Sequence, residues 1–148
     1  MRLLIHLAVQ PDEASTIQEI AERYGISRNH LVKIAHRAVQ AGWVEGTRGR
    51  GGGLKLARKA KEIGIGQVLR ATEDWRTVEC FDPVSNRCPI AGGCGLQPIL
   101  KDALTAYFAV LDRYSLADVV RRKSFLIQLL GLRTAKGPVQ RRKLHVVQ

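Results

Sequence analysis

Apolar positions in the first third of the sequence repeat at the spacing of short helices. Residues 2–9 are apolar on nearly every face and are followed by Pro11, which predicts a buried helix that ends there. Thr16 and Glu19 match a capping box, and an apolar stripe from this point to Gly25 predicts a second helix of roughly two turns. The stripe consists of Ile17, Ile20, Ala21 and Tyr24.

A third helix is predicted after the turn at Gly25. Ser27 can cap it, Gly42 is placed to end it, and four apolar residues recur on its inner face. They are Leu31, Ile34, Ala35 and Ala38. Two short helices around a turn predict a helix-turn-helix, whose second helix enters the major groove of DNA through its N-terminal residues.

The outer face of this third helix carries candidate DNA-binding residues. Arginine can pair with guanine, asparagine can pair with adenine, and a serine hydroxyl or backbone amide at a helix start can hold a phosphate. The residues that we expect to contact bases or phosphates in this way are Ser27, Arg28, Asn29, His30, Lys33 and Arg37. The plainer alternative is a solvated basic helix.

A β-wing is predicted next, because residues 43–44 and 54–56 read as two short strands. The loop between them contains five glycines together with two arginines. Glycines allow the backbone to approach DNA closely, so the arginines can reach the minor groove or the phosphates. The candidate wing residues are Arg48, Arg50, Gly51 and Gly52.

The rest of the chain predicts further helices around an irregular loop. Residues 66–71 suggest a short helix, residues 75–95 show no periodicity, and residues 96–114 form an amphipathic pattern of about five turns. A capping-box pattern at Ser115 and Asp118 opens another helix, which we expect to extend to residue 130.

The predicted fold is mainly α with a small β-wing, a winged helix-turn-helix followed by a long dimerisation helix. The expected domains are a DNA-binding domain over residues 1–72, a cysteine-containing loop over 73–95, dimerisation helices over 96–130 and a basic, disordered tail over 131–148. The long apolar stripe has little of its own chain to cover it, which favours a homodimer. Two recognition helices about 34 Å apart would then match a palindromic operator in double-stranded DNA.

The charge of the chain points to a polyanionic partner. The sequence has 24 Lys and Arg against 13 Asp and Glu, a formal net charge of +11. Residues 119–148 contain eight basic and no acidic side chains, whereas residues 71–118 contain four and seven. We find no secretory signal and no membrane-spanning stretch, so we expect the protein in a reducing cytoplasm with no membrane partner.

Three cysteines, Cys80, Cys88 and Cys94, lie in the irregular loop with the spacing C-x7-C-x5-C. This is not the paired spacing of a structural zinc site, and soft thiolates in a Gly- and Pro-rich loop suit an iron–sulfur cluster. Three ordinary buried thiols, or a zinc site completed by His or Asp, remain alternatives. An enzyme is disfavoured, because the sequence has no nucleophile–base constellation, P-loop or dinucleotide fingerprint.

Several segments together resemble the NsrR/IscR family of dimeric winged-helix iron–sulfur regulators, over about residues 2–120. They are GISRNHLVKIAHRAVQAGWVEGTRGRGGGLKLA, IGIGQVLRATE, ECF, CPIAGGC and YSLADVV. The NsrR branch of nitric-oxide sensors is the most similar. The resemblance implies that Cys80, Cys88 and Cys94 ligate a 2Fe-2S or 4Fe-4S cluster, whose state sets the geometry of the recognition helix. Nitric oxide would attack the iron, and the repressor would then leave its operator.

The fourth cluster ligand stays open at this point. NsrR-type members use an aspartate from a segment that precedes the start of this sequence, and the IscR branch uses a histidine where this chain has Gln97. The candidates here are His6, Asp12, Glu79 and Asp82. Two other functions are also open: an iron- or redox-sensing regulator of the same family, and a cluster-free repressor with a thiol or zinc switch.

Overall fold

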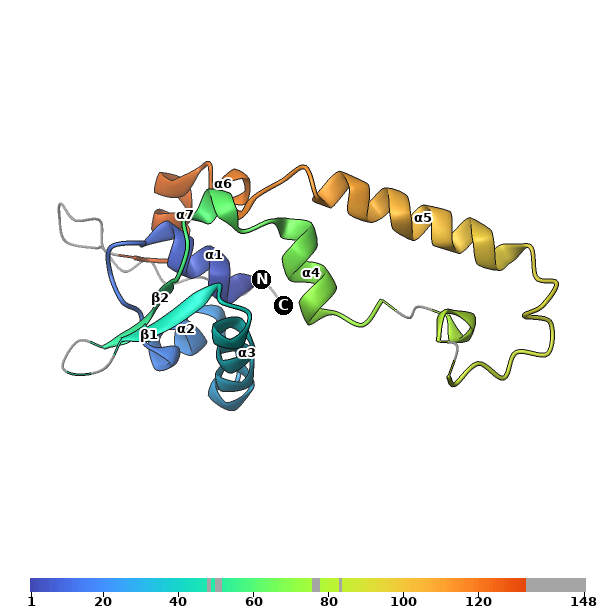
Figure 1. Ribbon diagram of the computed structural model, residues 1–148. Helices are drawn as coiled ribbons and strands as arrows, with labels where there is room; N and C mark the ends of the chain where they lie inside the picture. Colours follow the sequence, from blue (N-terminus) through green and yellow to red (C-terminus); the bar gives the residue numbers. More distant parts are fainter. Residues whose placement is uncertain (48, 50–51, 76–77, 83, 133–148) are drawn as a thin grey trace, which may run out of the picture. The chain divides into compact units, whose positions relative to one another are not determined.

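The computed structural model describes residues 1–47, 49, 52–75, 78–82 and 84–132 of the 148-residue chain (Figure 1). The described elements are α1 (Arg2–Val9), α2 (Ile17–Tyr24), α3 (Arg28–Gln40), β1 (Val44–Thr47), β2 (Gly53–Leu56), the 3-10 helix η1 (Ala60–Glu62), α4 (Ile65–Thr72), the 3-10 helix η2 (Glu79–Phe81), α5 (Leu96–Leu111), α6 (Leu116–Val119) and α7 (Lys123–Leu129). The prediction of a mainly helical fold with a two-stranded wing is confirmed.

The chain divides into two compact units. One comprises Arg2–Arg58 and the segment from Val119 onward, and the other comprises Met1 and Lys59–Asp118. The division falls at residue 59, ahead of the expected domain boundary at residue 72, because α4 packs on α5 within the second unit. Two predicted segments, the basic tail after Leu132 and part of the wing loop, lie outside the described residues.

The helix-turn-helix is built from local capping interactions. The Thr16 hydroxyl accepts the Glu19 N–H at 3.2 Å, and the Glu19 carboxylate accepts the Thr16 N–H at 2.8 Å, so the predicted capping box is present. Gly25 ends α2 with a left-handed φ of 60°, which glycine adopts without strain. The Ser27 hydroxyl accepts the His30 N–H at 3.4 Å and starts α3.

The core of the first unit holds these helices in place. α1 is buried on nearly every face, as its sequence predicts, and α2 and α3 each bury one apolar side. The most enclosed large apolar side chains of this unit are Leu3, Leu7, Val9, Ile20, Leu31 and Val44. Each such residue contributes about 1.5–3 kcal/mol by leaving water, so α3 is fixed on its inner side and exposed on the other.

β1 and β2 form an antiparallel hairpin that pairs Val44 with Leu56 and Thr47 with Gly53. Ser15 adds a third short segment, because its N–H and carbonyl both pair with the main chain of Leu54. A Cβ atom at Gly53 would lie only 2.8 Å from the Ser15 carbonyl oxygen. Glycine at position 53 therefore allows the wing to approach the segment between α1 and α2.

α4 and α5 pack together in the second unit through an aromatic and charged cluster. The Arg70 guanidinium donates two hydrogen bonds to the Asp112 carboxylate, at 2.7 and 2.6 Å, and lies 4.2 Å from the centre of the Phe108 ring. The hydrogen bonds from Arg70 lower the pKa of the Asp112 carboxyl group. Trp75 packs edge-on against Phe108 and donates to the Leu69 carbonyl at 2.9 Å.

Two helix boundaries differ from the prediction. α5 ends at Leu111 rather than at Tyr114, because the Tyr114 carbonyl accepts the Ile65 N–H at 2.9 Å and Ser115 forms a β-bridge with Gly64. The expected single helix from residue 115 to 130 is two helices, α6 and α7. The chain leaves helical geometry at Arg122, which has a ψ of 49°.

Within the part of the chain that the structure describes, no helix has the length and apolar character that crossing a membrane requires.

Candidate nucleic-acid interface and cysteine loop

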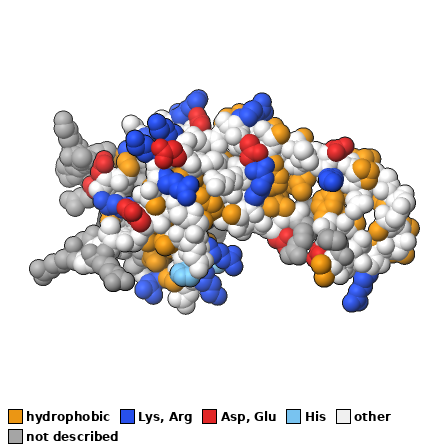
Figure 2. Space-filling model, viewed as in Figure 1, with side chains coloured by type: hydrophobic (Ala, Val, Ile, Leu, Met, Phe, Trp, Pro, Cys, Tyr) orange, Lys and Arg blue, Asp and Glu red, His pale blue; other side chains and the backbone are white. Residues whose placement is uncertain are grey.

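α3 carries a continuous exposed face of cations and hydrogen-bond donors. All six residues predicted for DNA contact at this helix are exposed: Ser27, Arg28, Asn29, His30, Lys33 and Arg37. The helix has no acidic residue in its sequence, so no carboxylate within α3 offsets the positive charge. Figure 2 shows Lys and Arg side chains with a histidine at the lower edge of the view, where Figure 1 places α3.

The N-terminal end of α3 suits an anion. The first backbone N–H groups of a helix point outward and carry the positive end of the helix dipole, which attracts phosphate. The Ser27 hydroxyl oxygen accepts the His30 N–H, so its own proton can still be donated to a phosphate oxygen. The arrangement can therefore hold the DNA backbone at the end of α3 and present Arg28 and Asn29 to base edges.

Sequence reasoning missed other exposed residues on the same helix, among them His36 and Val32. His36 is exposed one turn beyond Lys33, and the Val32 side chain is 40% exposed. Val32 offers methyl groups of the kind that contact the thymine methyl in the major groove. His36 could have been predicted, because it lies three residues after Lys33 and so falls on the same face of the helix. The exposure of Val32 could not have been predicted from the hydrophobic pattern.

Only one of the four residues predicted for the wing, Gly52, lies among the residues that the structure describes. Arg48, Arg50 and Gly51 lie outside the described residues, and Gly52 is half-buried with its N–H donating to the Gly49 carbonyl at 2.9 Å. Gly49 has a φ of 99°, a conformation that favours glycine. Gly52 thus serves the tip of the hairpin through its backbone.

The three predicted cysteines are free thiols in the second unit, and each is half-buried. Cys80 lies in η2, and its carbonyl accepts a 2.8 Å hydrogen bond from the Gln97 side chain. The Cys88 N–H donates to the Asn86 side chain at 3.0 Å. Cys94 directly precedes Gly95, the residue that caps the start of α5.

The donor set fits an iron–sulfur cluster in kind, since it offers three soft thiols from one loop. Among the residues that the structure describes, however, no three His, Cys, Asp or Glu side chains are gathered as a metal site would require. The loop as described therefore presents the three donors separately.

Two of the four candidates for the fourth ligand have structural partners within the cysteine loop. The Glu79 carboxylate accepts the Arg87 N–H. The Asp82 carboxylate accepts the Val84 N–H at 3.0 Å and the Ser85 hydroxyl at 2.8 Å. Both residues shape the loop between Cys80 and Cys88 in this structure. The other two candidates, His6 and Asp12, belong to the other unit.

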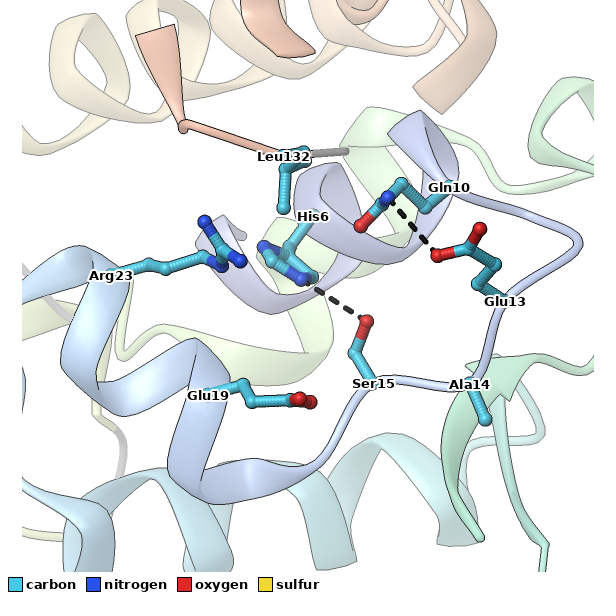
Figure 3. Close-up of a pocket in the computed structure, with 8 residues that line it drawn as sticks. All are labelled: His6, Gln10, Glu13, Ala14, Ser15, Glu19, Arg23 and Leu132. Atoms are coloured by element: carbon cyan, nitrogen blue, oxygen red, sulfur yellow. Dashed lines mark hydrogen bonds between the residues drawn. The ribbon is translucent and has the colours of Figure 1, made fainter. Parts of the chain in front are cut away.

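His6 has the environment of a core histidine. Its side chain is 1% exposed, and its Nε2 atom lies 3.2 Å from the Ser15 hydroxyl at the wall of a polar cavity of about 220 Å³ (Figure 3). Burial, assisted by the charge of Arg23, lowers the pKa of His6 from 6.5 to about 4. His6 is therefore neutral at physiological pH and supports the segment that carries Ser15.

α5 exposes large apolar side chains along most of its length. Phe108 is its one buried residue, whereas Ile99 is 63% exposed and Val110 45% exposed. Other exposed large residues of the helix are Leu96 and Tyr107. A row of this kind on a helix that presents few charges is suited to packing against another helix.

A helix-turn-helix with an exposed basic second helix and a β-wing defines a winged-helix DNA-binding protein. Residues 1–122 match the family model Rrf2, described as an iron-dependent transcriptional regulator. The chain belongs to the Rrf2 family, and it is accordingly a transcriptional regulator and not an enzyme.

Known proteins similar to this chain agree with that family. The HTH-type transcriptional regulator NsrR of Bacillus subtilis is 49% identical over 135 residues, which cover 90% of this chain and 92% of that protein. Two solved structures share the fold. T. potens IscR aligns with a TM-score of 0.66 and 23% identity over 92% of this chain and 86% of that chain. The global cysteine regulator CymR of B. subtilis aligns with a TM-score of 0.60 and 24% identity over 82% and 89%.

Proposed function

We propose that this protein is a homodimeric repressor that binds a palindromic operator and releases it when nitric oxide reaches an iron–sulfur cluster on Cys80, Cys88 and Cys94. The observation that carries the proposal is the set of three free, half-buried thiols in the loop that leads into α5. The NsrR name of the 49% identical relative and the iron dependence in the family description support it.

The DNA-binding role is assigned to α3 and the wing. Arg28 and Asn29 at the exposed start of α3 would read base edges, while Ser27, His30, Lys33 and Arg37 would hold phosphates or neighbouring bases. Arg48 and Arg50, with Gly51 and Gly52, would meet the minor groove or its phosphates. The exposure of all six residues at α3 supports this assignment.

The dimer is assigned to the apolar face of α5. Large apolar side chains exposed on one helix carry a cost in water that a second copy of the same helix removes. The dimer would present two copies of α3 to successive turns of the major groove.

The three cysteines would supply thiolate ligands to the cluster, and the loop between η2 and α5 would have to draw them together. A bound cluster would supply iron that nitric oxide can attack. The side chains of Glu79, Asp82 and Asn86 hold the turns of this loop through exposed or half-buried hydrogen bonds, and a bond of this kind contributes only about 0.5–1.5 kcal/mol.

The test is an anaerobic purification with a visible spectrum and counts of iron and sulfide. Stepwise nitric oxide should bleach the spectrum and release a duplex selected from a random-sequence pool. Changing any one of Cys80, Cys88 or Cys94 to Ala should abolish both the absorbance and the binding. Full, specific binding by a colourless triple variant would rule out a cluster-dependent repressor.

A second candidate function is a cluster-free regulator that switches through its thiols. The separate, free state of the three cysteines among the described residues favours it. In that case colourless protein would bind the selected duplex, and a thiol oxidant would release it while nitric oxide would leave binding unchanged. A regulator that senses iron or redox state through the same cysteines would change its DNA binding when an iron chelator or oxygen, instead of nitric oxide, is added stepwise.

A further inference from the structure

Gln97 occupies a position that links the two ends of the cysteine loop. It lies in the first turn of α5, three residues after Cys94, and its side-chain N–H donates to the Cys80 carbonyl at 2.8 Å. Side chains of a helix lean toward its N-terminal end, so an amide at this position reaches back toward the loop. The hydrogen bond is partly buried and joins residues 17 apart in sequence.

The other side-chain hydrogen bonds described for this loop join residues within the loop, and the longest of them connects the Arg87 N–H with the Glu79 carboxylate, eight residues apart. Asn86 accepts from Cys88 two residues away, and Asp82 accepts from residues two and three positions away. Such bonds set a turn but do not decide where that turn lies relative to α5. The Gln97 bond does, because it fixes the Cys80 peptide at the start of the helix that Cys94 precedes.

We infer that Gln97 is a positioning residue that holds Cys80 beside the start of α5, so that the first and last thiols of the loop are brought toward one site before any metal binds. The inference rests on the proposed function, in which these thiols are ligands. With the carbonyl of Cys80 held, the peptide plane that follows its Cα atom is fixed, which restricts the positions that the Cys80 thiol can reach through its staggered rotamers. Cys88, whose preceding residue Arg87 is tied to Glu79 through its N–H, is then the thiol that remains to be brought to the site.

Outer groups that orient metal ligands typically change metal affinity about tenfold or more when they are removed. Gln97→Leu removes the donor and keeps an apolar side chain of similar volume at a half-buried site. Gln67→Leu is the matched control, since Gln67 is exposed on α4 in the same unit. Neither residue is a proposed metal ligand or DNA contact.

The first measurement is the alkylation rate of each cysteine in reduced, metal-free protein, followed by mass spectrometry. In Gln97→Leu we expect Cys80 to react several-fold faster relative to Cys88, whereas Gln67→Leu keeps the wild-type ratio. The ratio separates loss of positioning from general loosening, because unfolding would raise all three rates together. An unchanged ratio, or an equal rise at all three cysteines, overturns the inference.

The second measurement is a titration with Co²⁺ alone, read by its thiolate charge-transfer absorption. Gln97→Leu should bind Co²⁺ about tenfold more weakly than wild type and Gln67→Leu. If all three proteins bind Co²⁺ with equal affinity, the inference is overturned. If wild type gives no thiolate band, the metal site of the proposed function fails, and the alkylation ratio alone decides whether Gln97 positions Cys80.

Discussion

Burial decides what the polar residues of the first unit do. Arg28 lies exposed at the start of α3 and is available to a ligand, whereas His6 lies in the core of the same unit and bonds to Ser15. The sequence pattern predicted both environments, because Arg28 falls on the polar face of an amphipathic helix and His6 lies in an apolar run. The partner of His6 was not predictable, since Ser15 is nine residues away across a turn.

Arg28→Ala should weaken binding to the selected duplex by about 1–3 kcal/mol and relax the base preference at one position. The physical reason is the loss of a bidentate contact to a base edge. Competition binding against single-base variants of the duplex measures both effects. Lys61→Ala, at an exposed cation of η1, is the control and should leave the preference intact. An unchanged base preference in Arg28→Ala would reassign Arg28 to a phosphate.

His6 makes the folded protein sensitive to acid. Its folded pKa of about 4 lies below the ordinary 6.5, so the unfolded chain binds more protons between these values. Stability is therefore lost as the pH falls from about 6.5 toward 4. His6→Leu removes this contribution, and on acidification from pH 7.5 to 5 its melting temperature should fall by roughly 4 °C less than that of wild type.

Circular dichroism melts at the two pH values measure the effect. His36→Gln is the matched control, because it removes an exposed histidine of α3 and leaves the buried one in place. Equal acid sensitivity in wild type and His6→Leu would show that His6 does not carry the dependence.

At the scale of elements, local signals were predicted well and long-range pairings were not. The starts of α2 and α3 follow from Thr16, Glu19 and Ser27, whose capping partners lie within three residues. The end of α5 depends on main-chain pairing of Tyr114 with Ile65, far away in sequence, which no local pattern reveals. The Gln97 contact with Cys80 escaped prediction for the same reason.

The exposed face of α5 gives a prediction about assembly. Ile99→Glu places a carboxylate where the proposed dimer buries an apolar side chain, and burying a charge without a partner costs several kcal/mol. The dimer should therefore dissociate about 100-fold more readily. Sedimentation velocity over a concentration series measures this.

Lys101→Glu is the control for that experiment. Lys101 is exposed on α5 two residues further on, which turns it well away from Ile99 around the helix. Its change of charge is larger than that of Ile99→Glu, so a purely electrostatic effect would appear there more strongly. Dissociation by both variants alike would argue against an apolar interface at Ile99.

For the molecule as a whole, the uneven charge matters more than its sum. The net charge of +11 contains five cations within residues 133–148, none of them offset by an acid in that segment. Such a segment is expected to attract phosphates without reading sequence. We therefore expect sequence specificity to reside in α3 and the wing, and the tail to add affinity for any duplex.

A chain shortened after Leu132 should bind DNA with a weaker dependence on salt. The slope of log affinity against log salt should decrease by about 0.9 for each phosphate contact that is lost. Fluorescence anisotropy between 50 and 300 mM salt gives the slope for selected and random duplexes. The ratio of the two affinities should stay constant, and a fall in that ratio would assign the tail a role in specificity.

The close approach of the wing to Ser15 implies that the glycines of the hairpin differ in how freely they can evolve. Gly46 has open space around its missing Cβ, whereas any side chain at Gly53 meets the Ser15 main chain. Codon randomisation with selection for repression should recover many residues at position 46 and glycine alone at position 53. Which amino acids can replace a glycine of this hairpin during evolution would then depend on the main chain of Ser15, between α1 and α2, rather than on contact with DNA.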